Sequence, residues 1–136
     1  MIVADTNLIG YLFLESGQSA LAEQALRRDS EWAAPLLWRS ELRNVLALQV
    51  RQRALSLAAS QQIMDAALDL MAGREHGVDS GQVLQLAAVS GCSAYDCEFV
   101  AVAQDLGVPL VTGDRQVLRA FPRVAVSLAE FAGGAA

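Results

Sequence analysis

The hydrophobic residues of this 136-residue chain form short uninterrupted runs that alternate with longer segments of helical spacing. Short apolar runs bounded by turn residues predict buried strands, and apolar positions that recur every three or four residues predict amphipathic helices. The predicted strands are 1–4, 31–34, a weaker candidate at 75–78, a strand of about 5 to 6 residues through Leu110 and Val111, and 124–126. The predicted helices are 8–14, 19–28, 35–51, a segment capped by Ser56 and ended by Gly73, 80–90, 94–106 and 115–120. This alternation predicts an α/β fold with a parallel sheet covered by helices on both faces.

The stretch from Ser93 to Asp114 is the clearest unit in this pattern. Ser93 is a favourable helix N-cap, and Gly107 suits the left-handed position that ends a helix. A helix of about 13 residues and the strand that follows it both span roughly 20 Å. When such a helix packs antiparallel to the strand, its first turn lies beside the end of that strand. We therefore expect Asp96 and Asp114 to lie close together.

Composition limits the kind of protein that this chain encodes. Hydrophobic residues make up 54% and charged residues 18%, which is enough for the core of one domain. We expect that domain to cover residues 1–132, with 133–136 as a flexible tail. The formal net charge is −5, with ten arginines and no lysine, so the surface as a whole does not favour binding to a polyanion such as nucleic acid.

Nothing in the sequence predicts membrane association. No stretch of about 18 uninterrupted apolar residues occurs, and the first residues lack the pattern of a signal peptide. Cys92 and Cys97 do not specify a disulfide framework, so we expect both to be reduced residues in or near the core. These features predict a cytoplasmic protein.

Glu41 lies within an apolar stripe of its predicted helix. At about 100° per residue, the residues on the same face are Leu37, Trp38, Asn44, Val45 and Leu48. A buried acid is rare without a partner. An internal salt bridge would explain this position, and so would metal binding.

Four carboxylates are predicted to meet at one edge of the sheet. Asp5 and Asp114 follow strands, whereas Glu41 and Asp96 lie in the first two turns of helices, and strand ends share an edge with helix starts in a βα fold. Like charges at about 5 Å cost on the order of 1 to 3 kcal/mol per pair, and burial adds desolvation. A divalent cation with oxygen ligands, Mg²⁺ or Mn²⁺, would remove this repulsion.

Such a cation would determine the chemistry of the site. It would lower the pKa of bound water and stabilise the negative charge that develops on a phosphodiester in the transition state. A carboxylate that is not needed as a ligand would serve as general base. The pattern therefore indicates metal-dependent phosphodiester hydrolysis.

Four segments carry these acids in a distinctive order. They are Val3-Ala4-Asp5-Thr6-Asn7, Ser40-Glu41-Leu42-Arg43-Asn44-Val45-Leu46, Ala94-Tyr95-Asp96-Cys97-Glu98-Phe99-Val100-Ala101-Val102-Ala103 and Leu110-Val111-Thr112-Gly113-Asp114. Together they resemble the PIN domain of the VapC toxins of bacterial type II toxin–antitoxin systems, over essentially the whole chain. The resemblance implies a PIN-like three-layer α/β fold with a parallel sheet of about five strands. It also implies a Mg²⁺- or Mn²⁺-dependent endoribonuclease that cleaves RNA, forms a homodimer and is inhibited by a cognate antitoxin.

The resemblance also implies roles for individual residues. Those that match the family's metal-binding and catalytic acids are Asp5, Glu41, Asp96 and Asp114. Those that match its supporting polar positions are Thr6, Asn7 and Thr112. Arg115 is the basic residue nearest to these in sequence and is the candidate for contact with RNA.

Two other functions remain open. The chain could be a noncatalytic PIN-like module that binds RNA or protein, or a DNA-directed nuclease of the same fold. Phosphotransfer through an aspartyl-phosphate is disfavoured, because that chemistry uses a lysine near the phosphoryl group and the chain has none.

Structural roles compete with the catalytic ones. Asp5 and Asp114 suit the N-caps of the helices that follow them, and Asp96 suits a capping box with Ser93. The remaining candidates are interpreted as structural: His76 as a surface residue, Trp32 and Trp38 as core or dimer contacts, and Arg39 and Arg43 as a solvated or protein-contact face.

Overall fold

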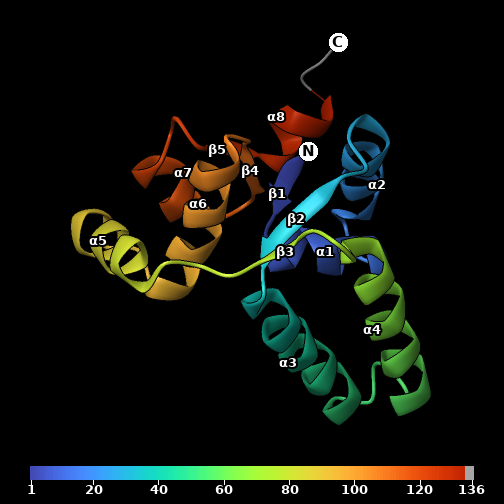
Figure 1. Cartoon of the computed structure of the whole chain (residues 1–136). Coiled ribbons are helices and arrows are strands. Elements are labelled where there is room, and N and C mark those ends of the chain that lie inside the picture. The colour runs from blue at the N-terminus through green and yellow to red at the C-terminus, as the bar shows by residue number, and fades with distance from the viewer. Residues whose placement is uncertain (134–136) are drawn as a thin grey trace.

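The computed structural model describes residues 1–133, which contain a five-stranded parallel sheet in the order β3-β2-β1-β4-β5 (Figure 1). The strands are β1 Ile2–Ala4, β2 Trp32–Pro35, β3 Glu75–His76, β4 Leu110–Thr112 and β5 Ala125–Ser127. The predicted α/β class is therefore confirmed. β4 has 3 residues instead of the expected run of about 5 to 6, because Gly107 to Pro109 form the turn and proline cannot donate to a strand ladder.

Helices connect and flank these strands. Their bounds are α1 Thr6–Phe13, α2 Ser19–Arg28, α3 Leu37–Arg51, α4 Leu57–Met71, α5 Ser80–Ser90, α6 Ala94–Leu106, α7 Arg115–Ala120 and α8 Leu128–Gly133. The predictions for α2, α5, α6 and α7 agree with the observed bounds. In α6 the hydroxyl of Ser93 accepts from the backbone N–H of Asp96 at 3.0 Å, and Gly107 ends the helix with φ 66°. Local capping signals therefore fixed this helix at both ends.

The helices form a layer on each face of the sheet. α6 packs against β1, β2 and β4, and α5 packs against α6. Figure 1 shows these two helices on one side and α1, α2 and α4 on the other. α3 and α4 form a pair that projects beyond the carboxyl ends of the strands (Figure 1). The space between α3 and the start of α6 therefore lies at the edge where strands end.

The core is built on the strands and on two tryptophans. β1, β2 and β4 are buried along their whole length, and both Trp32 and Trp38 are completely buried. The indole N–H of Trp38 donates to Glu75 at 2.8 Å. Arg39 forms a bidentate pair with the same carboxylate, with Nε 2.5 Å from Oε2 and Nη2 2.6 Å from Oε1. Arg39 is therefore part of an ion pair that the sequence did not predict, while its side chain stays 39% exposed, as its interpretation as a solvated residue requires.

The expectation for the two cysteines is confirmed, whereas the expectation for His76 is not. Cys92 and Cys97 are buried free cysteines, as expected. His76 is half-buried in β3, and its Nε2 atom is buried without a hydrogen bond to residues 1–133. The expectation that His76 is a surface residue was therefore wrong.

The start of α3 differs from the prediction, because Pro35 belongs to β2 and the helix begins at Leu37. The backbone N–H groups of Ala34 and Leu36 both donate to β3. The nitrogen of Pro35 thus faces the other side, where pairing with β1 has already ended at Ala33. Proline loses no ladder hydrogen bond at such a position.

α8 was not predicted. Its start carries a serine and a glutamate at capping-box spacing, and the hydroxyl of Ser127 accepts from the N–H of Glu130 at 3.1 Å. α8 packs against α2, where Arg28 lies 4.9 Å from the centre of the Phe131 ring. Gly133, expected to begin the tail, is the last residue of α8. The rest of the predicted tail, 134–136, lies outside the described residues.

α5 is less buried than its sequence suggested. Val83 is its only buried residue among those described, whereas the neighbouring Leu84 is 65% exposed. Within residues 1–133 no single helix is both long and apolar enough to cross a membrane. α5 and α6 pass such a test only as a pair, and they are bent by 115° relative to each other.

Candidate active site

Two of the predicted site residues are placed by neighbouring strands. Asp5 directly follows β1, and Asp114 lies two residues beyond β4. Because β1 and β4 are parallel and Ala4 pairs with Val111, both acids reach the same edge of the sheet. Each is also an N-cap: Asp5 accepts from the N–H of Leu8 at 2.7 Å, and Asp114 accepts from the first turn of α7 at 2.9 and 3.1 Å. The capping roles expected from the sequence are confirmed.

Two threonine hydroxyls hold two of the acids. Thr112 Oγ1 donates to Asp5 Oδ2 at 2.6 Å and accepts from the backbone N–H of Asp114 at 3.0 Å. Thr6 Oγ1 donates to Glu41 Oε1 at 2.6 Å. Both threonines are buried, at 8% exposure for Thr6 and 2% for Thr112. Each threonine therefore orients a neighbouring carboxylate, and Thr112 links the residues at the ends of β1 and β4.

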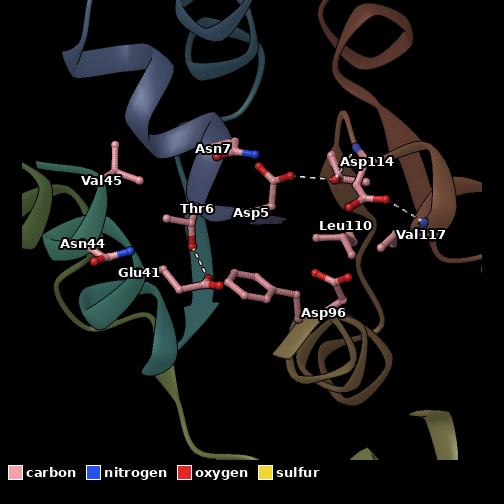
Figure 2. A pocket seen from close by; sticks show the side chains of 12 residues that line it. Asp5, Thr6, Asn7, Glu41, Asn44, Val45, Asp96, Leu110, Asp114 and Val117 are labelled. Carbon is pink, nitrogen blue, oxygen red and sulfur yellow. Dashed lines mark hydrogen bonds between the residues drawn. The ribbon is translucent and has the colours of Figure 1, made fainter. Parts of the chain in front are cut away.

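The four predicted acids line one pocket of about 260 Å³ between α3, α6 and the carboxyl ends of β1 and β4 (Figure 2). Glu41 reaches it from the second turn of α3, and Asp96 reaches it from the first turn of α6. The complete lining consists of Asp5, Thr6, Asn7, Glu41, Asn44, Val45, Asp96, Phe99, Leu110, Thr112, Asp114 and Val117. The sequence therefore identified the acids, threonines and Asn7 that meet here. Arg115 is exposed at the start of α7 and is not part of this lining.

Burial and mutual repulsion act on the acids of the pocket. Burial raises the pKa of Asp5 from 3.8 to about 6, against the lowering effect of its hydrogen bonds from Thr112 and Leu8, and the charge of Asp114 adds to the rise. The pKa of Asp96 is also raised, mainly by burial and then by the charge of Asp114. No ion pair within residues 1–133 involves these acids. The salt bridge considered for Glu41 is therefore not formed, and its polar partner is Thr6.

Sequence reasoning did not single out two residues that bear on the site. Glu98, two positions after Asp96, has its pKa raised by burial and then by the charge of Glu41, so a further acid lies near the pocket. Asn44 lies one turn after Glu41 and lines the pocket. Helical spacing places Asn44 on the same face as Glu41, and this spacing could have identified Asn44 as a residue of the site.

The ligand atoms that the lining offers suit a hard divalent cation. Carboxylate oxygens dominate it, and no basic side chain within residues 1–133 contributes to it. The carboxylates are not drawn together, however: in the described part of the chain, no three His, Cys, Asp or Glu side chains are arranged so that they could hold one metal ion. Hydrogen bonds to threonines and to the start of α7 occupy part of the oxygen surface of Asp5, Glu41 and Asp114.

Comparisons with known proteins agree with this architecture. A family model described as PIN domain matches residues 2–126. A search of curated proteins finds no match. Among solved structures, PAE2754 from Pyrobaculum aerophilum is similar with a TM-score of 0.77 and 21% identity, over 96% of this chain and 92% of that one.

Two further solved structures have a similar fold. A toxin–antitoxin complex from Klebsiella pneumoniae gives a TM-score of 0.69 at 19% identity, over 94% of this chain and 98% of that one. FitAcB from Neisseria gonorrhoeae gives 0.75 at 19% identity, again over 94% and 98% of the two chains. At this level of identity, the similarity shows a common fold.

Proposed function

The chain belongs to the PIN domain family, whose members are generally nucleases, and on that premise we propose that it is a metal-dependent endoribonuclease. It hydrolyses phosphodiester bonds of RNA and is the toxin of a toxin–antitoxin pair in the cytoplasm. The observation that carries this proposal is a pocket lined by four carboxylates and, among the described residues, by no basic side chain.

Asp5, Glu41, Asp96 and Asp114 are the residues that would hold Mg²⁺ or Mn²⁺. PIN domain nucleases usually use divalent metals, and the raised pKa values of Asp5 and Asp96 indicate carboxylates that lack a compensating positive charge. When bound, the cation supplies charge that orients the phosphodiester and stabilises its transition state.

The protein's own groups complete the reaction. Thr112 fixes Asp5, and Thr6 fixes Glu41, so both carboxylates are oriented before substrate binds. A carboxylate oxygen of the pocket that is not engaged in binding takes the proton of the attacking water. The phosphodiester is cleaved by water without a covalent enzyme intermediate.

The antitoxin is proposed to bind between α3 and α4. An apolar groove of about 380 Å³ lies there, with Leu46, Leu57 and Met64 in its lining and Arg43 and Arg51 also contributing. In a chain with net charge −5 these arginines form a local positive site. An amphipathic segment that carries acidic side chains complements both features.

The homodimer is proposed to form through α5 and the start of α6. Leu84, Val89 and Tyr95 are 65%, 77% and 63% exposed, and they lie on two helices that pack against each other. Large apolar side chains exposed on neighbouring helices are candidates for a contact between protein chains. A second copy of this chain would bury them.

The test is cleavage of a pool of cellular RNA by the purified protein with Mg²⁺, with Mn²⁺ and with EDTA. We expect cleavage with either metal, none with EDTA, and at least about a 100-fold lower rate for Asp96→Asn, because a ligand of the cation is lost. Circular dichroism of the variant checks that it remains folded.

The same assay separates the alternatives. Single- and double-stranded DNA are offered under the same conditions, and faster cleavage of DNA would favour a DNA-directed nuclease. Absence of metal-dependent cleavage of any nucleic acid would favour the noncatalytic binding module. Cleavage of RNA by Asp96→Asn at the wild-type rate would contradict the assignment of the site.

A further inference from the structure

The pocket offers many acceptors and few donors to a substrate that is itself an anion. A phosphodiester accepts hydrogen bonds through its non-bridging oxygens and donates none. Carboxylates also only accept when they are ionised. A cation bound by the acids would contact part of the phosphate, and N–H or O–H groups of the protein could donate to the remaining oxygens.

The threonine hydroxyls of the pocket are already committed. Thr6 donates its only hydroxyl proton to Glu41, and Thr112 donates its own to Asp5, each at 2.6 Å. A hydroxyl has a single proton to donate. Neither threonine can therefore donate to the substrate without releasing the carboxylate that it holds.

Two carboxamides in the lining are uncommitted. The side chains of Asn7 and Asn44 make no hydrogen bond within residues 1–133, and both residues are exposed to solvent. Figure 2 shows Asn7 beside Asp5 on α1, and Asn44 on α3 near Thr6 and Glu41. Each carboxamide has two N–H donors. They are the only lining side chains of the described chain with donors left to offer.

We propose that Asn7 and Asn44 bind the substrate phosphodiester, so that neutral amides take the place that arginine or lysine occupies in many phosphate sites. This inference rests on the proposed nuclease function and identifies which side chains grip its substrate. Among residues 1–133 no basic residue lines the pocket, and the chain contains no lysine.

The neutrality of an amide has a physical advantage here. An arginine next to unpaired carboxylates forms ion pairs with them, as Arg39 does with Glu75 in this same molecule. A guanidinium in the pocket would therefore pair with the acids and compete with the cation. An amide donates to phosphate oxygens without neutralising the metal ligands.

The test is the steady-state cleavage of a random-sequence single-stranded RNA pool with Mn²⁺ by Asn44→Ala, Asn7→Ala and the double variant. We expect KM to rise about tenfold or more for each single variant, as for loss of a hydrogen bond to a charged group. We expect kcat to stay within about twofold, because ground state and transition state lose the same contact. Asn44→Asp keeps the side-chain shape but replaces the donors with a charge, and its KM should rise further.

A second measurement excludes an indirect effect. Mn²⁺ binding, followed by calorimetry without RNA, should have the same affinity in Asn44→Ala as in wild type. The matched control is Gln62→Ala, which removes an exposed carboxamide from α4 away from the pocket and should leave KM and kcat unchanged.

The outcomes separate this inference from the proposed function. If wild type cleaves RNA and the alanine variants keep its KM, or if Asn44→Asp does, the amides do not bind substrate, while the nuclease assignment stands. If Mn²⁺ affinity falls as much as KM rises, the amides act through the cation and the inference is wrong. If wild type itself does not cleave RNA, both are overturned.

Discussion

Two acidic positions in this sheet have opposite surroundings. Glu75, in β3, accepts from the Nε and Nη2 groups of the Arg39 guanidinium and from the Trp38 indole, and these bonds lower its pKa. Asp5, just after β1, has no cationic partner within residues 1–133, and burial raises its pKa to about 6. One molecule thus contains a fully paired carboxylate and an unpaired group of carboxylates.

The difference distinguishes an acid that stabilises the folded state from an acid that is available to bind a ligand. A carboxylate whose pKa is lowered by its partners stabilises the folded state when ionised, whereas a buried carboxylate with a raised pKa destabilises it. Asp5 and Asp96, two acids without a cationic partner that are desolvated in one pocket, therefore indicate a function for which stability was given up. Three experiments test this contrast.

The largest effect is expected where a neighbour orients an unpaired acid. Thr112→Val removes the hydroxyl that donates to Asp5 and replaces it with a methyl group. RNA cleavage should fall about 10- to 100-fold, which is typical when a group that orients a metal ligand is lost. Thr112→Ser, which keeps the hydroxyl, is the control and should retain most activity. Equal rates for wild type and Thr112→Val would show that Asp5 needs no such support.

A divalent cation should distinguish the two acidic positions by its effect on stability. At a Mn²⁺ concentration about 100 times its dissociation constant, wild type should gain about 2.7 kcal/mol in free energy of unfolding. Thermal unfolding with Mn²⁺ and with EDTA measures the gain. Asp96→Asn should lose most of it, while Glu75→Gln should keep it. A gain that survives in Asp96→Asn would place the cation elsewhere.

The smallest effect is expected from Glu75→Gln, which removes the charge of the paired acid. At pH 7 the variant should be less stable by about 1 kcal/mol, since charge-assisted hydrogen bonds are lost but Arg39 is partly exposed. Because the pKa of Glu75 is lowered from 4.5 in the folded state, this stability is present above pH 4.5 and is lost as the pH falls below it.

Urea unfolding at pH 7 and at acidic pH measures that difference. The gap between wild type and Glu75→Gln should shrink at the lower pH. Glu23→Gln, at an exposed position of α2, is the control and should show no gap at either pH. A gap that grows on acidification would contradict the role assigned to Glu75.

Much of the fold could be predicted because its signals are local. Ser93 and Gly107 fixed the ends of α6, and short apolar runs identified β1 and β4, so the sequence alone placed Asp5 and Asp114 at one edge of the sheet. The positions of Glu41 and Asp96 followed from helical spacing and from the rule that helix starts adjoin strand ends.

The rest depended on tertiary contacts. Arg39 could be assigned a partner only when β3 placed Glu75 beside α3. Glu98 lies near Glu41 because the fold brings α6 and α3 to the same pocket, which spacing within one helix does not encode. Leu84 is as hydrophobic as a core residue, but within the described part of the chain its helix, α5, has substantial contacts only with α6.

β3, the strand that carries Glu75, is also an edge strand of the sheet. With only the 2 residues of β3 at this border, very few free backbone N–H and C=O groups remain there for an extended segment of another chain to pair with. Short borders of this kind limit uncontrolled sheet growth and aggregation. Substitutions that lengthen β3 would therefore endanger the solubility of the protein before they changed its chemistry.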